Sequence, residues 1–221
     1  MKFSVSKENY LKTIFHLQSE NEIVTTNELA SALQTKPASI TDMLKKLKKQ
    51  KLLDYERYKG FKLNNEGKKV ALQIIRKHRL WEYFLVNKLQ FGWNEVHEMA
   101  EELEHFSSKK LIDRLDTFLN YPKSDPHGDP IPDINGKFNR QKKQMSLLKL
   151  ALNKPAIVLA ISPQTTEILE LLQHKNILIG SKIAIKKKFS FDDSLEVKVN
   201  NKSTVTISAT VAKNILVNDD E

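Results

Sequence analysis

The stretch from Thr25 to Leu63 reads TTNELASALQTKPASITDMLKKLKKQKLLDYERYKGFKL and decides the fold of the N-terminal part of the chain. Thr25 and Glu28 have the spacing of a capping box, in which each side chain accepts a hydrogen bond from an amide at the start of a helix. Pro37 suits the first turn of a second helix, because the amide it lacks would be unpaired there anyway. The stretch therefore predicts two short helices joined by a tight turn, a helix-turn-helix.

The second of these helices is amphipathic and basic, and a hairpin follows it. Its apolar residues repeat at helical spacing, and four lysines lie on the opposite face: Lys45, Lys46, Lys48 and Lys49. Leu52–Tyr55 and Phe61–Leu63 are short extended candidates on either side of a basic tip at residues 57–60. A further helix from about Ser6 to Leu17 precedes the capping box. The whole pattern predicts a winged helix in residues 1–70.

The remainder of the chain divides into a helical part and a β-rich part. Long apolar periodicity predicts helices at about residues 64–85, 93–106 and 108–119, followed by a proline-rich loop. Together they form a predicted helical domain in residues 71–137, and residues 138–154 read as a linker. Residues 155–221 carry short β-branched runs separated by turns, with one helix near Thr165 to Gln173. The predicted fold class is mainly α, with a small β-rich C-terminal domain.

Composition excludes several classes of protein. Apolar residues make up 40% and charged residues 29% of the 221 residues, so the chain can build packed cores. It has no cysteine, which excludes disulfides, thiolate metal sites and cysteine nucleophiles. The N-terminus has no apolar signal segment, and the longest apolar run, Ala156–Ile161, is too short to span a bilayer. We therefore expect a soluble, cytoplasmic protein with no membrane partner.

Charge is distributed unevenly along the chain. The formal net charge is +9 overall, but +8 lies in residues 1–77, −5 in residues 78–135 and +6 in residues 136–221. A basic N-terminal third can face a polyanion such as DNA, whereas the acidic middle cannot. Ordinary solvated lysines would give the same net charge, so sequence motifs must distinguish them from a DNA-binding surface.

Histidines and carboxylates gather in the acidic middle of the chain. They occur at helical spacing on two predicted helices: His78, Glu82, His97, Glu101, Glu104 and His105. Two facing helices with such side chains can hold divalent metals through nitrogen and oxygen ligands. The alternative is a solvated acidic face with incidental histidines. His16, His127 and His174 are interpreted in that way.

At this point the sequence resembles the diphtheria-toxin-repressor family of metal-dependent bacterial transcription repressors, including its manganese-sensing branch. The match is carried by Glu8-Asn9-Tyr10-Leu11, Lys77-His78-Arg79-Leu80 with Glu82, Val96-His97, Leu103-Glu104-His105 and the loop Asp125-Pro126-His127-Gly128-Asp129-Pro130-Ile131-Pro132. The resemblance covers about residues 5–135, and the β-rich tail is similar to the family's SH3-like third domain. It implies a winged helix, a helical metal-binding and dimerisation domain, and a small third domain.

The resemblance also implies two sets of metal ligands. The primary site would comprise Glu101, Glu104 and His105, with a ligand from the side chain or the backbone of Asn9. The ancillary site would comprise His78, Glu82 and His97. Iron-sensing members complete that site with a Glu-x-x-Gln pair, and this chain has the pair in swapped order. Its members here are Gln164 and Glu167.

Two departures from the family bear on the choice of metal. Glu101 stands where iron sensors have cysteine, and its oxygen ligand favours Mn(II) over softer ions. Two-domain manganese sensors usually have Asp and Glu in the first helix, where this chain has Asn9 and Lys12. A protonated lysine cannot be a ligand. The expected metal is therefore Mn(II), with Fe(II) as the alternative.

The implied function is metal-activated repression by a homodimer on a palindromic double-stranded DNA operator, controlling metal-uptake genes. In the recognition helix we expect Lys36, Ser39 and Thr41 to reach phosphates or base edges, and Ala38 to touch a thymine methyl. Arg57 and Lys59 on the wing would contact the backbone or the minor groove. No small organic substrate is expected.

Two other functions remain open from the sequence. Clustered histidines and carboxylates could activate water in a di-metal hydrolase, although the chain has no nucleophile motif and no glycine-rich phosphate loop. A winged-helix regulator could also keep the shape of the middle domain and sense no metal. Operator binding with and without a chelator would separate these alternatives.

Overall fold

The computed structural model describes residues 3–56, 59–138, 143–162 and 165–218. The chain forms two compact units. The first comprises Met1–His78, Glu101–Phe118 and Pro132–Lys137, and the second comprises Arg79–Ala100, Leu119–Ile131 and Phe138–Glu221.

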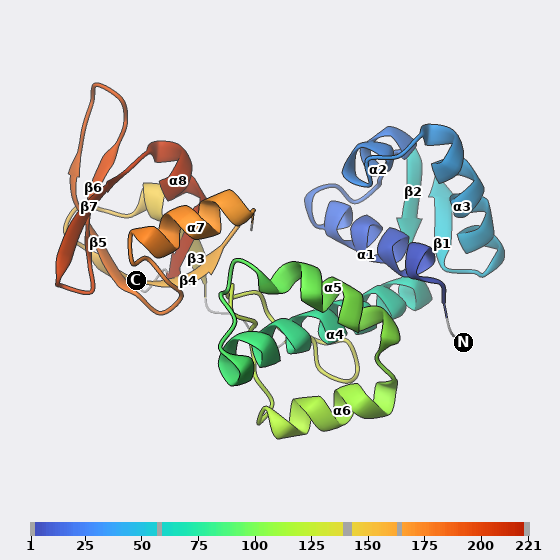
Figure 1. The fold of residues 1–221 in the computed structure, drawn as a ribbon. Coiled ribbons are helices and arrows are strands. Elements are labelled where there is room, and N and C mark those ends of the chain that lie inside the picture. Colours follow the sequence, from blue (N-terminus) through green and yellow to red (C-terminus); the bar gives the residue numbers. More distant parts are fainter. Residues whose placement is uncertain (1–2, 57–58, 139–142, 163–164, 219–221) are drawn as a thin grey trace. The chain divides into compact units, whose positions relative to one another are not determined.

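The N-terminal part of the first unit is the predicted winged helix (Figure 1). Its elements are α1 (Val5–Glu20), α2 (Thr26–Ala32), α3 (Pro37–Lys49), β1 (Leu53–Glu56) and β2 (Gly60–Leu63). The Thr25–Glu28 capping box is present, and Pro37 stands in the first turn of α3. The first helix begins at Val5, earlier than expected from Ser6. The helix-turn-helix and the wing are both confirmed.

One glycine fixes where the wing returns to the helices. Gly60 has φ +141°, and a Cβ added there would lie 2.3 Å from the carbonyl oxygen of Val24. That close approach allows Val24 and Phe61 to pair backbone to backbone, each amide donating to the other's carbonyl at 2.9 Å. Phe61 is fully buried as a result. Any side chain at position 60 would therefore push the hairpin away from the core.

Three helices follow: α4 (Asn65–Leu89), α5 (Val96–Phe106) and α6 (Lys109–Phe118). Within the first unit Arg76 holds α6 against α4, because its guanidinium donates to Asp113 at 3.2 Å and to Asp116 at 2.7 Å. The fifth helix begins at Val96 rather than at Trp93 as expected, because the Gly92 amide donates to the Glu95 carboxylate and closes a turn there.

The β-rich domain of the second unit contains a six-stranded antiparallel sheet. Its strands are β3 (Gln144–Ser146), β4 (Pro155–Ile161), β5 (Lys182–Lys188), β6 (Leu195–Val199), β7 (Ser203–Ile207) and β8 (Ile215–Asn218), in the order β3-β8-β4-β5-β6-β7. Figure 1 shows α7 (Thr166–His174) and α8 (Ala209–Asn214) beside this sheet. The predicted β-rich domain is confirmed.

The sheet begins earlier and ends later than the sequence patterns indicated. Part of the expected linker at residues 138–154 forms β3 and a 3-10 helix, η1 (Leu147–Lys149), and Leu147 is fully buried. A three-residue strand is too short for its periodicity to show. It is ordered by pairing with β8, in the register Met145 to Val217.

Among the described residues, no helix combines the length and the apolar character needed to cross a membrane.

Candidate metal centres

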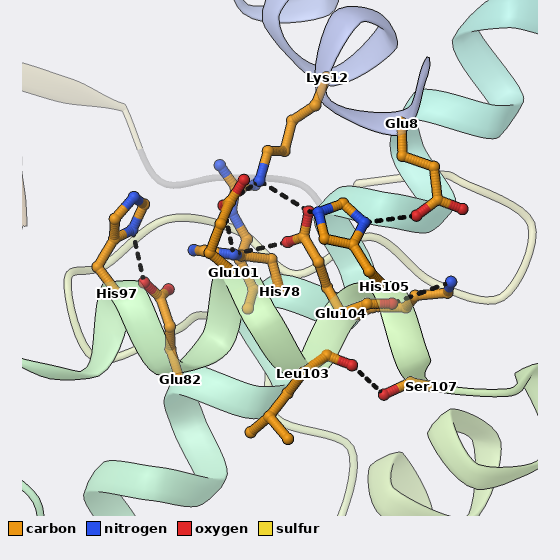
Figure 2. Close-up of polar contacts among 12 residues, drawn as sticks. Glu8, Lys12, His78, Glu82, His97, Glu101, Leu103, Glu104, His105 and Ser107 are labelled. Atoms are coloured by element: carbon orange, nitrogen blue, oxygen red, sulfur yellow. Dashed lines mark hydrogen bonds and ion pairs between the residues drawn. The ribbon is translucent and has the colours of Figure 1, made fainter. Parts of the chain in front are cut away.

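Side chains from three helices of the first unit converge on one cluster (Figure 2). We call it the α1–α5 cluster; its members are Glu8, Lys12, His78, Glu101, Glu104 and His105. One ligand atom from each of Glu101, Glu104 and His105 lies within 4.8 Å of the other two. The structure therefore brings together three of the four residues expected in the primary site, and Asn9 comes from the first turns of α1.

Glu104 lies at the centre of this cluster and is fully buried. His78 Nδ1 lies 2.7 Å from one of its carboxylate oxygens, and Lys12 Nζ donates to the other at 2.8 Å. Lys12 also donates to Glu101. The structure thus places His78, which was expected in the ancillary site, against the expected primary ligand Glu104.

A carboxylate on α1 orients His105. Its Nδ1 lies 2.7 Å from a carboxylate oxygen of Glu8, which cannot donate when ionised, so Nδ1 carries the proton. The other ring nitrogen, Nε2, then presents a lone pair. This nitrogen and Asn9 Oδ1 are both buried with no hydrogen-bond partner in the described part of the chain. A buried imidazole nitrogen with no hydrogen-bond partner among the described residues, 3.6 Å from a carboxylate oxygen of Glu104, is what a divalent cation would satisfy.

A second cluster lies in the second unit, and we call it the His127 cluster. Its members are Glu82 on α4 and Asp125 and His127 in the loop after α6, and one ligand atom from each lies within 4.8 Å of the others. All three are buried. His127 was expected to be an incidental loop residue, and nothing in the loop's sequence has a period that would have marked its burial.

Backbone contacts hold the loop of the His127 cluster in place. The Asp125 carboxylate accepts the amides of His127 and Asp129, each at 2.9 Å. Gly128 has φ +92°, and a Cβ there would lie 1.9 Å from the carbonyl oxygen of Leu159 in β4. The Ile161 amide donates to the His127 carbonyl at 3.1 Å. The β-rich domain and the loop therefore form one structure within this unit.

The imidazole of His127 has one paired and one unpaired nitrogen. Nε2 donates to the carbonyl oxygen of Trp93 at 2.7 Å, and the two rings stack with centroids 5.9 Å apart. Nδ1 lies 3.8 Å from Glu82 and has no hydrogen-bond partner among the described residues. Nδ1 therefore faces a carboxylate inside the cluster.

Burial shapes the titration of the His127 cluster. Burial, together with the charges of Glu82 and Asp129, raises the pKa of Asp125 to about 7. Burial by itself would lower the pKa of His127, but the neighbouring carboxylates of Glu82 and Asp125 outweigh burial and raise that pKa. This cluster therefore holds protons near neutral pH.

The remaining residues expected in the ancillary site are Glu82, His97, Gln164 and Glu167. His97 Nδ1 is 3.3 Å from Glu82, so these two are together. Glu167 is exposed, and Gln164 lies outside the described residues. A pocket of about 360 Å³ in the second unit is lined by His97, His127 and, from α7, by Glu170 rather than Glu167. Glu170 lies three residues after Glu167 on α7. Nothing in the sequence favoured one of these two residues over the other as a ligand.

The expected DNA-contacting residues that the structure describes are exposed. Lys36 is the N-cap residue of α3, and Ala38, Ser39 and Thr41 follow it on the solvent side of that helix. Thr41 donates to the carbonyl of Pro37 at 3.0 Å. Lys59 is exposed on the wing, and Arg57 lies outside the described residues.

Comparisons with known families cover almost the whole chain in three segments. Residues 2–61 match the family described as iron dependent repressor, N-terminal DNA binding domain. Residues 64–133 match iron dependent repressor, metal binding and dimerisation domain, and residues 145–219 match the FeoA domain.

Two individual proteins that are similar in sequence are named as regulators of the same kind. The HTH-type transcriptional regulator MntR of Oceanobacillus iheyensis is 35% identical over 120 residues, which span 54% of this chain and 81% of that protein. The iron-dependent repressor IdeR of Mycobacterium leprae is 32% identical over 127 residues, 58% of this chain and 55% of that protein.

A solved structure described as a manganese-dependent transcriptional repressor in complex with manganese superposes with a TM-score of 0.84 at 31% identity, covering 96% of this chain and 99% of that one. The fold, the three matched segments and these relatives agree. The chain belongs to the diphtheria-toxin-repressor family of metal-dependent, DNA-binding transcriptional repressors.

Proposed function

We propose that this repressor is activated by Mn(II), with Fe(II) as the alternative, bound in the α1–α5 cluster by Glu101, Glu104, His105 and Asn9. The observation that carries the proposal is the convergence of Glu101, Glu104 and His105, in which the buried His105 Nε2 has no hydrogen-bond partner among the described residues and lies 3.6 Å from Glu104. Three oxygen donors and one imidazole suit Mn(II), and the absence of cysteine removes the soft ligand that would favour other ions.

The same residues connect metal binding to DNA binding. Asn9 belongs to α1, which packs with the helix-turn-helix, whereas the other three ligands belong to α5 of the metal-binding and dimerisation segment. When bound, the ion would supply positive charge shared by ligands from both segments. Glu8 holds His105 in the tautomer that leaves Nε2 available. In a dimer this link fixes the spacing of the two α3 helices for successive major-groove faces of a palindromic operator.

The His127 cluster is a second metal site in this proposal. Glu82, Asp125 and His127 offer two carboxylates and one unpaired nitrogen, and His97 contacts Glu82. His78 contacts Glu104, so we assign it to the α1–α5 cluster rather than to the site that contains Glu82. Glu170 on α7 is a better candidate than Glu167 for a ligand from the β-rich domain, because it lines the pocket with His97 and His127.

Several broader assignments complete the proposal. The regulated genes are those for metal uptake, the protein acts in the cytoplasm, where bacterial DNA lies, and it has no catalytic activity. The boundaries of its domains lie near residues 70 and 137. The third domain starts at about residue 144, with β3, rather than at 155.

Operator binding under metal control tests the proposal. The protein would be titrated with Mn(II), Fe(II) and Zn(II), or treated with chelator, on a DNA fragment from its own upstream region. We expect Mn(II) to raise operator affinity in the native protein and to have no effect in Glu104→Ala. Glu102→Ala is the matched control, because Glu102 is exposed on the same helix. Metal-dependent binding that survives in Glu104→Ala would refute the assignment of the site.

Fe(II) and Mn(II) are separated in the same experiment. Full activation by Fe(II), together with failure of Mn(II) at the same free concentration, would place the protein with the iron sensors. Glu101→Cys should shift the preference toward Zn(II), because a thiolate is the softer ligand.

A further inference from the structure

Lys12 holds a position in the α1–α5 cluster that a ligand residue would be expected to hold. Its ammonium donates to Glu101 and, at 2.8 Å, to Glu104 (Figure 2). Its side chain is only 13% exposed, and that of Glu104 is completely buried. The lysine therefore forms a largely buried ion pair with two carboxylates, and it connects α1 to α5.

The charges explain why a cation is needed there. An ionised carboxylate as buried as Glu104 is costly unless a positive charge or hydrogen bonds compensate it, and Glu101 adds a second negative charge beside it. An ammonium is a compact point charge with three donors, so it can bond both carboxylates at once.

We propose that Lys12 is a built-in substitute for the metal ion. It neutralises Glu101 and Glu104 and links α1 to α5 in the metal-free protein, and the activating ion must displace it. The inference rests on the proposed metal site, because it assumes that Glu101 and Glu104 are the carboxylates that bind the ion. The flexible four-carbon stem of lysine permits the displacement without movement of the helix backbone.

Displacement has a consequence for sensing. Metal affinity is lowered by the free energy with which Lys12 already stabilises the two carboxylates, so the lysine raises the metal concentration at which the repressor responds. A divalent ion can still displace the lysine, because it carries twice the charge. The ion would also bind Asn9 Oδ1 and His105 Nε2, which have no hydrogen-bond partner among the described residues.

The test is Lys12→Met, which keeps the length of the side chain and removes its charge. We expect Mn(II) affinity, measured by calorimetry without DNA, to rise about tenfold or more, because a competing charge within ion-pair distance is gone. In chelator, the thermal midpoint should fall by several degrees. Lys69→Met is the control, since Lys69 makes an exposed ion pair with Glu66 at 2.7 Å, and it should change neither quantity.

Two further variants make the test specific to charge. Lys12→Arg keeps the positive charge and should retain an affinity near that of the native protein. In Lys12→Met/Glu101→Gln, one fewer carboxylate needs compensation, so the thermal midpoint in chelator should recover. The coupling between positions 12 and 101 should then be present in chelator and absent with saturating Mn(II). If Lys12→Met is insoluble without metal, rescue by Mn(II) or by Glu101→Gln supports the proposal, and rescue by neither overturns it.

Failure of this inference can be told from failure of the metal site. If Glu104→Ala still responds to Mn(II), the site itself is wrongly assigned. If Glu104→Ala abolishes the response but Lys12→Met binds Mn(II) no more tightly than the native protein, the site stands and the substitute-cation proposal is overturned.

Discussion

The α1–α5 cluster and the His127 cluster contain the same kinds of side chain but stabilise their buried carboxylates differently. In the first, the negative charge of Glu101 and Glu104 faces the ammonium of Lys12. In the second, the Arg79 guanidinium lies 3.5 Å from Asp125, but burial and the charges of Glu82 and Asp129 outweigh it and raise the pKa of Asp125 to about 7. One cluster is neutralised by a lysine from another helix, whereas the other combines a guanidinium with bound protons.

The difference indicates what each cluster responds to. The α1–α5 cluster joins the DNA-binding segment to the metal-binding segment, so we expect its occupant to affect DNA binding. The His127 cluster joins α4 to a loop that is hydrogen-bonded to β4, so we expect its occupant to affect the packing of the β-rich domain within the second unit. We therefore expect variants of the first to change operator binding and variants of the second to change stability and its dependence on pH.

The largest effect is expected when one histidine of a cluster, His105 or His127, is replaced by alanine in separate variants. His105→Ala removes a proposed ligand of the α1–α5 cluster, and metal-dependent operator affinity should fall by about a hundredfold or more. His127→Ala should reduce it by less than about tenfold, because its cluster is in the second unit. Binding isotherms in fixed free Mn(II) measure both, with the exposed His174→Ala as control. Equal losses in the two variants would contradict the separation of roles.

The next effect concerns the carboxylate that orients His105. Glu8→Ala removes the acceptor at 2.7 Å that fixes the tautomer of this histidine, and the loss of such a partner typically lowers metal affinity about 10- to 100-fold. Calorimetric titration with Mn(II) measures it, with Glu102→Ala again as the control. A Glu8→Ala affinity equal to the native value would show that Glu8 does not position the ligand.

A smaller effect distinguishes the clusters by pH. The pKa values of Asp125 and His127 are both raised by folding, so the folded state binds more protons than the unfolded state, and stability falls as the pH rises. For Asp125 the window runs from its ordinary value of 3.8 to about 7. In chelator, the free energy of unfolding should fall by about 2 kcal/mol between about pH 5 and pH 7.

Denaturant titrations at a series of pH values measure this fall. In Asp125→Asn most of it should disappear, because the titrating group is gone while an oxygen remains to accept the amides of His127 and Asp129. Asp133→Asn should retain it, since hydrogen bonds from the Lys137 and Asn135 amides lower the pKa of Asp133 instead. Stability that rises with pH in the native protein over this range would contradict the assignment.

The smallest effect concerns DNA contacts outside both clusters. Lys36→Ala should weaken operator binding a few-fold and reduce the slope of log affinity against log salt by about one, because one phosphate contact is lost. Lys182→Ala, an exposed lysine on β5, should leave the slope unchanged. An unaltered slope in Lys36→Ala would exclude this residue from the phosphate-contacting surface.

Patterns with a local physical cause were predictable from the sequence. The capping box at Thr25, the first-turn proline at Pro37 and the hairpin before Phe61 each depend on residues a few positions apart, and all three are present. The spacing of Glu101, Glu104 and His105 likewise placed three ligand atoms together, because one turn of helix brings them onto one face. The short strand β3 was not predicted, because it is ordered by pairing with β8, which lies about 70 residues later in the sequence.

The sequence by itself therefore determined the winged helix, the helical middle, the β-rich end and the residue types that could hold a metal. Only the tertiary structure decided which distant residues meet: Lys12 with Glu101 and Glu104, Glu8 with His105, and His127 with Glu82. The physical reason is that helical periodicity reports on neighbours within a turn, whereas charge compensation acts through space between segments. His127 illustrates this most clearly, because a residue in a loop without periodicity is buried by contacts with α4, Trp93 and β4.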